Sequence, residues 1–183
     1  MMYRINAGHI PGDHWTQDPK QGGGRIIGEV CHFIDLMQYF CEADPVEVSA
    51  FSIACEDQSV IPADNTVISL RFTDGSTGSI GYFAEGAKGM PKERLEIFGG
   101  GRSGVIDNFT RVEFFSGSSR KVRKFSGKGH AEEMKAFVSA LSTGEAPVSV
   151  TSMLSTTLAT FRIVESQSDG KPRTVDLSDL TGE

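Results

Sequence analysis

Apolar residues recur at helical intervals in three parts of the chain. Residues 24–41 carry them three and four positions apart, which predicts an amphipathic helix along this segment. The same spacing predicts helices over 131–141 and 151–168, and Gly144 and Gly170 end them. One helix near the start and two near the end therefore flank a long central region of different character.

The central region alternates apolar and polar residues, as strands with one buried face do. Asp74-Gly75 is a hairpin turn signal, and most of the other connections are short. Short connections join antiparallel neighbours, so the sheet should be mainly antiparallel. The predicted strands are 3–7, 46–53, 66–72, 77–83, 94–98, 104–106, 111–115, 121–125 and 173–177.

Strands grouped apart from helices predict an α+β domain with its helices packed on one face of a large sheet. The other face is then open to water or to a partner. Not all of the large apolar strand residues can be assigned to the helix-covered face, so we expect the open face to serve dimerisation. These residues are Phe51, Ile53, Phe72, Ile80, Phe83, Phe98, Phe114 and Phe125.

Composition narrows the function classes. The 183 residues suit one domain with its own core. A net charge of -6 offers no basic field for nucleic acid or an anionic membrane. No apolar run approaches the ~18 residues that cross a bilayer, and the start shows no signal peptide, so we expect a cytoplasmic protein. Three cysteines without a C-x-x-C pair argue against a disulfide framework and a structural zinc site.

The first candidate site is the glycine run 22–24 with the helix that follows it. Glu29, His32 and Asp35 stand three residues apart, so they lie along one side of a helix. The N–H groups of a helix start favour anionic or hydroxyl-rich ligands, and a histidine is suited to general acid–base chemistry. From these residues alone, solvated carboxylates and a buried, hydrogen-bonded His32 remain the simpler interpretation.

The second candidate is the loop 6–15, which brings Asn6, His14 and the single tryptophan, Trp15, together. An aromatic face beside polar groups suits a sugar ring or a nucleotide. The alternative is a hydrogen-bonded turn whose tryptophan closes the edge of the core. The loop does not decide between the two.

Two further patterns are rejected as sites. Residues 99–104 fit G-x-G-x-x-G, but strands precede and follow them, which predicts a hairpin loop and no dinucleotide site. His9, His14, Glu29 and His32 could supply metal ligands, yet no ligand spacing supports a metal site. A small metal hydrolase built on these histidines is therefore the weakest of the functional hypotheses.

The glycine run and its helix resemble the glucose–fructose oxidoreductase / inositol dehydrogenase / MocA family. Members carry a pattern like G-G-G-x-L-x-D-x-G-x-H-x-x-D at the start of their C-terminal domain. The matching residues are Gly22, Gly23, Gly24, Ile26, His32 and Asp35, and the likeness continues through 95–99, 133–148 and 158–172.

The resemblance implies that residues 1–183 form the C-terminal substrate-binding and dimerisation domain of an oxidoreductase. A Rossmann domain that binds NAD or NADP would precede it and is absent from this chain, which would be inactive alone. The family histidine matches His32, which would exchange a proton with a sugar, sugar-nucleotide or polyol hydroxyl while hydride moves. The expected partners are a sugar-like substrate, the Rossmann domain and a second copy paired through the sheet.

One departure from the family pattern affects the site. Gly28 stands where the family has an acid, and Val30 where it has a glycine. Glu29 is one residue along, a rotation of about 100° around a helix. Gly28 favours the alternative of a non-catalytic binding or oligomerisation module of the same fold. For the enzyme, we predict His32 and Glu29 as catalytic residues, and Asn6, His14, Trp15, Arg25 and Asp35 as substrate-binding residues.

Overall fold

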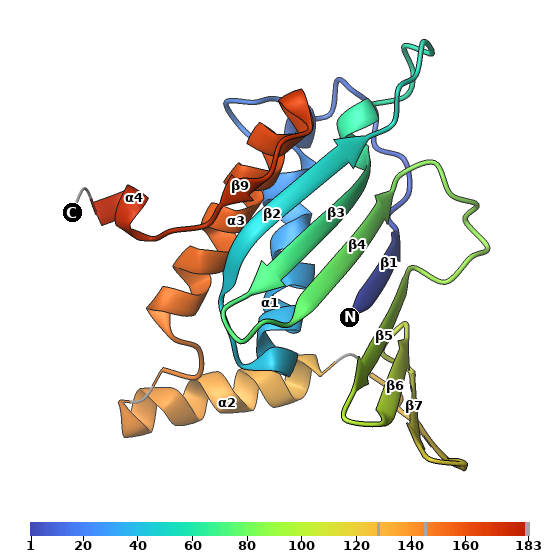
Figure 1. Cartoon of the computed structure of the whole chain (residues 1–183), viewed down its shortest axis with the longest axis vertical. Coiled ribbons are helices and arrows are strands. Elements are labelled where there is room, and N and C mark those ends of the chain that lie inside the picture. Colours follow the sequence, from blue (N-terminus) through green and yellow to red (C-terminus); the bar gives the residue numbers. More distant parts are fainter. Residues whose placement is uncertain (128, 145, 182–183) are drawn as a thin grey trace.

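The computed structural model describes residues 1–127, 129–144 and 146–181 (Figure 1). Within them one nine-stranded sheet carries the fold, and its strands run in the order β8-β7-β6-β5-β1-β4-β3-β2-β9. The strands are β1 (Met2–Asn6), β2 (Pro45–Ser52), β3 (Asn65–Phe72), β4 (Thr77–Phe83), β5 (Glu93–Gly99), β6 (Arg102–Asp107), β7 (Arg111–Ser116), β8 (Ser119–Lys124) and β9 (Arg173–Thr174). The α-helices are α1 (Cys31–Cys41), α2 (His130–Thr143), α3 (Val150–Asp169) and α4 (Ser178–Thr181).

The prediction of an α+β domain with a large, mainly antiparallel sheet is confirmed. The exception to antiparallel pairing is β1, which runs parallel to β4 and antiparallel to β5. The first strand of the chain is thus inserted at the centre of the sheet, between strands that follow each other in sequence. The expected last strand, 173–177, shortens to the two residues of β9.

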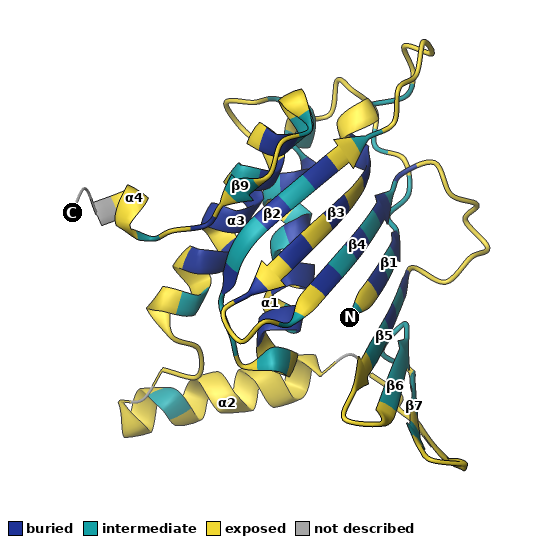
Figure 2. Ribbon diagram, in the orientation of Figure 1, coloured by how far each residue is buried: buried dark blue, intermediate teal, exposed yellow. Residues whose placement is uncertain are grey.

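The core lies between one face of the sheet and the helices α1 and α3 (Figures 1 and 2). Each element contributes the apolar residues that its periodicity places on the inner side, and full burial of such a side chain is worth about 1.5–3 kcal/mol. Fully buried examples are Ile5, Ile34, Met37, Ile68, Ile80 and Ile163.

The predicted helix over 24–41 begins differently from a regular α-helix. Gly23 and Gly24 adopt positive φ angles of 70° and 84°, which glycine tolerates best. A π-helical turn, Ile26–Val30, follows before α1 starts. Hydrogen bonds in a π-turn span five residues, one more than in an α-helix. Glu29 lies within this turn, so regular α-helical spacing does not apply at its position.

Two apolar surfaces of the domain stay exposed. Helix α2 has no buried residue, although Met134, Phe137 and Leu141 form the apolar stripe that the sequence predicts. On the strands, Phe51 and Val67 are 63% and 48% exposed on the face opposite the helices. The helix-free face is therefore open, as predicted; its use in dimerisation remains a prediction.

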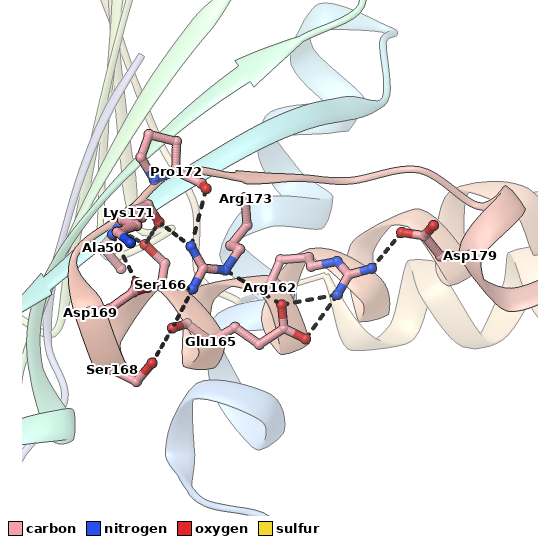
Figure 3. A network of polar contacts seen from close by, with 10 residues as sticks. All are labelled: Ala50, Arg162, Glu165, Ser166, Ser168, Asp169, Lys171, Pro172, Arg173 and Asp179. Atoms are coloured by element: carbon pink, nitrogen blue, oxygen red, sulfur yellow. Dashed lines mark hydrogen bonds and ion pairs between the residues drawn. The ribbon is translucent and has the colours of Figure 1, made fainter.

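A polar network joins the C-terminal segment to α3 (Figure 3). The buried Ser166 hydroxyl accepts the N–H of Ala50 at 2.9 Å and donates to the carbonyl of Lys171 at 2.7 Å. This one side chain therefore connects α3 to both β2 and the turn before β9. Ion pairs on the surface extend the network through Arg162, Glu165, Asp169, Arg173 and Asp179.

None of the described helices is both long and apolar enough to span a membrane.

Candidate functional site

A cavity of about 550 Å³ opens beside the beginning of α1. Strand β1, the first residues of β5 and the β6–β7 turn supply the other walls. Segments far apart in the sequence meet here because β1 is inserted beside β5. The lining residues are Tyr3, Ala7, Ile10, Arg25, Glu29, His32, Phe33, Asp35, Leu36, Lys92, Glu93 and Phe109.

His32 and Asp35 line this cavity from the outer face of α1. Both are exposed, and no hydrogen bond or ion pair joins either side chain to another described residue. Residues three apart on a helix are neighbours, so an imidazole and a carboxylate lie next to each other on one wall. The alternative of a buried, hydrogen-bonded His32 is wrong.

Glu29 also lines the cavity, and Arg25 holds it there. The Arg25 Nε atom lies 2.9 Å from Glu29 Oε1, and the guanidinium is buried. Its other nitrogens donate to the carbonyls of Gly8 at 2.6 Å and Ala7 at 3.3 Å. The guanidinium also stacks over Tyr82, 5.2 Å from the ring centroid. Arg25 therefore reaches the cavity wall with its donors already engaged by the protein.

Burial raises the pKa of ionisable groups in and around the cavity wall. It raises the pKa of the Asp64 carboxyl, although a hydrogen bond from Gln17 at 2.6 Å and the charge of Arg25 oppose the shift. Burial likewise raises the pKa of the Tyr3 and Tyr82 phenols. The Tyr3 hydroxyl donates to Glu93 Oε2 at 2.6 Å. Both tyrosines therefore remain neutral phenols at physiological pH.

The three predicted residues of the loop 6–15 do not line the cavity. Asn6 Nδ2 donates to the carbonyls of Ala87 and Met90 at 2.9 and 3.1 Å. His14 caps a short 3-10 turn, Trp15–Gln17, and Trp15 is 61% exposed beside the His14 ring. Protein groups thus engage the Asn6 amide nitrogen and the His14 ring, Thr16 in the case of His14, whereas the buried Asn6 Oδ1 atom has no hydrogen-bond partner among the described residues. A substrate-binding role for these residues remains a prediction.

Sequence reasoning missed several residues of the cavity. Tyr3, Lys92 and Glu93 come from β1 and the start of β5, and Phe109 comes from the β6–β7 turn with a φ of 56°. The only local signal was the charged run 92–94 immediately before a predicted strand. Pairing between β1 and β5 assembles these side chains, and no short-range pattern reports such pairing.

The structure describes both patterns that the sequence led us to reject, residues 99–104 and the candidate metal ligands. Residues 99–102 form the turn of the β5–β6 hairpin, so the prediction of a hairpin loop is confirmed. In the described part of the chain, no group of three or more histidine, cysteine or acidic side chains is arranged to hold a metal ion.

The fold and the cavity agree with a family assignment. Residues 2–103 match the model of the GFO/IDH/MocA C-terminal domain, so the chain belongs to this family. No curated protein sequence matches the chain significantly.

Solved structures share the whole architecture. Levoglucosan dehydrogenase in complex with NADH superposes with a TM-score of 0.73 at 19% identity, over 96% of this chain and 57% of that one. An oxidoreductase from Agrobacterium radiobacter, in complex with NAD+, L-tartaric acid and magnesium, gives 0.72 at 14%, over 95% and 56%. Aldose-aldose oxidoreductase from Caulobacter crescentus, complexed with glycerol, gives 0.74 at 15%, over 94% and 55%. The chain thus spans little more than half the length of each neighbour.

Proposed function

We propose that this chain is the substrate-binding domain of an NAD- or NADP-dependent oxidoreductase that acts on a hydroxyl of a sugar, sugar nucleotide or polyol. One observation carries the proposal: His32, on the family's histidine position, lines a cavity, and its side chain makes no hydrogen bond or ion pair with another described residue. About 550 Å³ lies within the usual range for small-ligand sites. Polar groups and aromatic walls together suit a polyhydroxylated ring.

In this proposal the chain's own residues position the substrate and move a proton. The His32 imidazole takes up or returns the proton of the reacting hydroxyl. The adjacent Asp35 carboxylate accepts a hydrogen bond from a neighbouring hydroxyl, and Phe109 covers the apolar side of the ring. The nicotinamide, when bound, accepts or supplies the hydride. Glu29, fixed by Arg25, is the second catalytic candidate because it lines the same cavity.

A separate nucleotide-binding domain completes the site in this proposal. Its support is that the chain spans just over half of each structural neighbour, and that two of them are complexes with NAD+ or NADH. The described residues hold no glycine-rich turn between a strand and a helix that could cradle a dinucleotide. The exposed stripe of Met134, Phe137 and Leu141 on α2 is the surface that we assign to docking of this domain.

The decisive experiment uses the native protein together with whatever domain accompanies residues 1–183. We expect it to reduce NAD+ or NADP+ with at least one member of a panel of sugars, sugar nucleotides and polyols, followed by NAD(P)H absorbance. The isolated chain should bind neither nucleotide measurably, because its described residues lack a cradle for one. Tight nucleotide binding to the isolated chain would contradict the assignment. Sugar binding without any turnover in the native protein would favour the non-catalytic module, to which Gly28 points.

We also propose that the open face of the sheet pairs two copies of the chain. The exposed Phe51 and Val67 lie on this face, and covering such apolar side chains with a partner is favourable. Analytical ultracentrifugation should give a dimer for the wild-type chain and a monomer for Val67→Glu. Val164→Glu provides the charge-matched control, because it changes a valine that is 40% exposed on α3, on the other side of the sheet, and should remain a dimer. A monomeric wild type at micromolar concentration contradicts the pairing.

A further inference from the structure

We propose that Lys92 binds an acidic group of the substrate, a carboxylate or a phosphate, and so selects acidic sugar derivatives over neutral ones. The inference rests on the proposed function, because it concerns the ligand of the same cavity. Lys92 is absent from the family pattern that the sequence displays. It lies in the connection between β4 and β5, at the point where the chain enters β5.

The first argument concerns the charges that line the cavity. Its carboxylates include Glu29, which Arg25 holds, and Glu93, which accepts the Tyr3 hydroxyl. The guanidinium of Arg25 in turn donates its hydrogen bonds to Glu29 and to two backbone carbonyls. Lys92 differs from Arg25, since its ammonium makes no hydrogen bond or ion pair with any described side chain. It is therefore the lining cation whose donors are available to a ligand.

The second argument concerns closure of the cavity. An exposed lysine is well solvated, but a nucleotide-binding domain over the cavity removes much of that water. A buried charge without a counter-charge is costly, whereas a carboxylate or phosphate paired with an ammonium forms a strong, charge-assisted hydrogen bond. A ligand that carries its own acidic group removes this cost. Asp35 then remains available to accept hydrogen bonds from the hydroxyls.

The third argument is that the protein fixes the backbone of Lys92 in place. The N–H of Asn6 donates to the Lys92 carbonyl at 2.7 Å, and Arg4 Nη1 donates to the Pro91 carbonyl at 2.6 Å. The Asn6 side chain holds the same connection at Ala87 and Met90. Asn6, which the sequence marks as a substrate-binding residue, thus acts here as a positioning residue for Lys92. A fixed backbone keeps the attachment point of the lysine side chain at the cavity, so only side-chain freedom is lost when a ligand binds.

The test compares three probes that share one pyranose ring: glucose, glucuronate and glucose 6-phosphate. Their dissociation constants are measured by calorimetry at constant ionic strength on the native protein, with the domain that accompanies residues 1–183. We expect at least one acid to bind about tenfold to a hundredfold more tightly than glucose, the scale of one charged hydrogen bond. Tighter binding of glucuronate indicates a substrate with a carboxylate, and tighter binding of glucose 6-phosphate indicates a substrate with a phosphate.

Variants then assign the preference to one side chain. Lys92→Met should abolish the preference for acids and leave glucose binding within about threefold, because only a charged hydrogen bond is lost. Lys92→Arg should keep it. Lys88→Met removes an equal charge from an exposed position of the same connection, outside the cavity lining, and should change nothing.

Equal affinity of the wild type for glucose and both acids, or no detectable binding of the acids, overturns the proposal. So does a preference that survives Lys92→Met. These outcomes are separate from failure of the oxidoreductase assignment, which is judged by nucleotide reduction in the native protein. If the enzyme oxidises neutral polyols and Lys92→Met does not change that activity, the proposed function stands and the inference about Lys92 is wrong.

Discussion

Replacement of His32 by alanine is expected to lower turnover of the native enzyme by roughly a hundredfold or more, the scale of lost general acid–base catalysis. The imidazole lines the cavity and makes no hydrogen bond or ion pair with another described residue, so the substitution removes the group that the proposal assigns to the proton transfer. The measurement is the steady-state rate of NAD(P)H formation with the preferred substrate. Because a proton-transfer step is lost, kcat should fall far more than KM rises.

The same exposure provides the control for stability. The His32 side chain is exposed and makes no hydrogen bond or ion pair with another described residue, so the melting temperature of His32→Ala should match that of the wild type. Added imidazole should restore part of the lost rate, since a small base can occupy the space left by the side chain. His9→Ala removes a histidine that pairs with Glu85 outside the cavity lining and should retain full turnover. A near-normal rate in His32→Ala would remove this residue from catalysis.

Arg25→Met is expected to produce the largest loss of stability, about 3–5 kcal/mol in the free energy of unfolding. The guanidinium side chain is only 2% exposed and serves Glu29 as well as the carbonyls of Ala7 and Gly8. Methionine fills a similar volume but leaves the carboxylate and both carbonyls without their donors. Urea denaturation followed by circular dichroism measures the change.

Two further variants separate the buried charge from the shape of the side chain. Arg25→Met combined with Glu29→Gln should recover part of the loss, because the unpaired carboxylate is then gone. Arg71→Met breaks an exposed ion pair with Glu47, at 3.0 Å, and should cost less than about 1 kcal/mol. A loss below that level in Arg25→Met would show that the cavity wall does not depend on this arginine. Arg25 would then be free to serve the substrate, as the sequence suggests.

Local patterns were sufficient where one element decides its own structure. The stripe of residues 24–41 and the alternation along 66–72 correspond to a helix and a strand, because side-chain periodicity reports directly on backbone geometry. The prediction for residues 99–104 also succeeded, since the strands on either side exclude a βαβ unit. The resemblance carried by the glycine run located His32 and Asp35, which do share a cavity.

Other features depend on contacts that no local pattern contains. The glycine run predicted an α-helical start, yet Ile26–Val30, which contains Glu29, forms a π-turn. The prediction placed the helices on one face of the sheet, and α1 and α3 lie there, yet α2 has no buried residue in the described chain. Periodicity states which face of an element is apolar; it does not state what meets that face.

The sequence by itself therefore determined the α+β class, the order of the elements and the helix that presents His32. Only the tertiary structure decided which side chains surround that histidine and which are already engaged. Inserting β1 between β4 and β5 brings Tyr3 beside Glu93, and the fold turns Arg25 inward to Glu29. The physical reason is that secondary structure follows from neighbours along the chain, whereas strand order and the pairing of buried polar groups follow from segments brought together by packing.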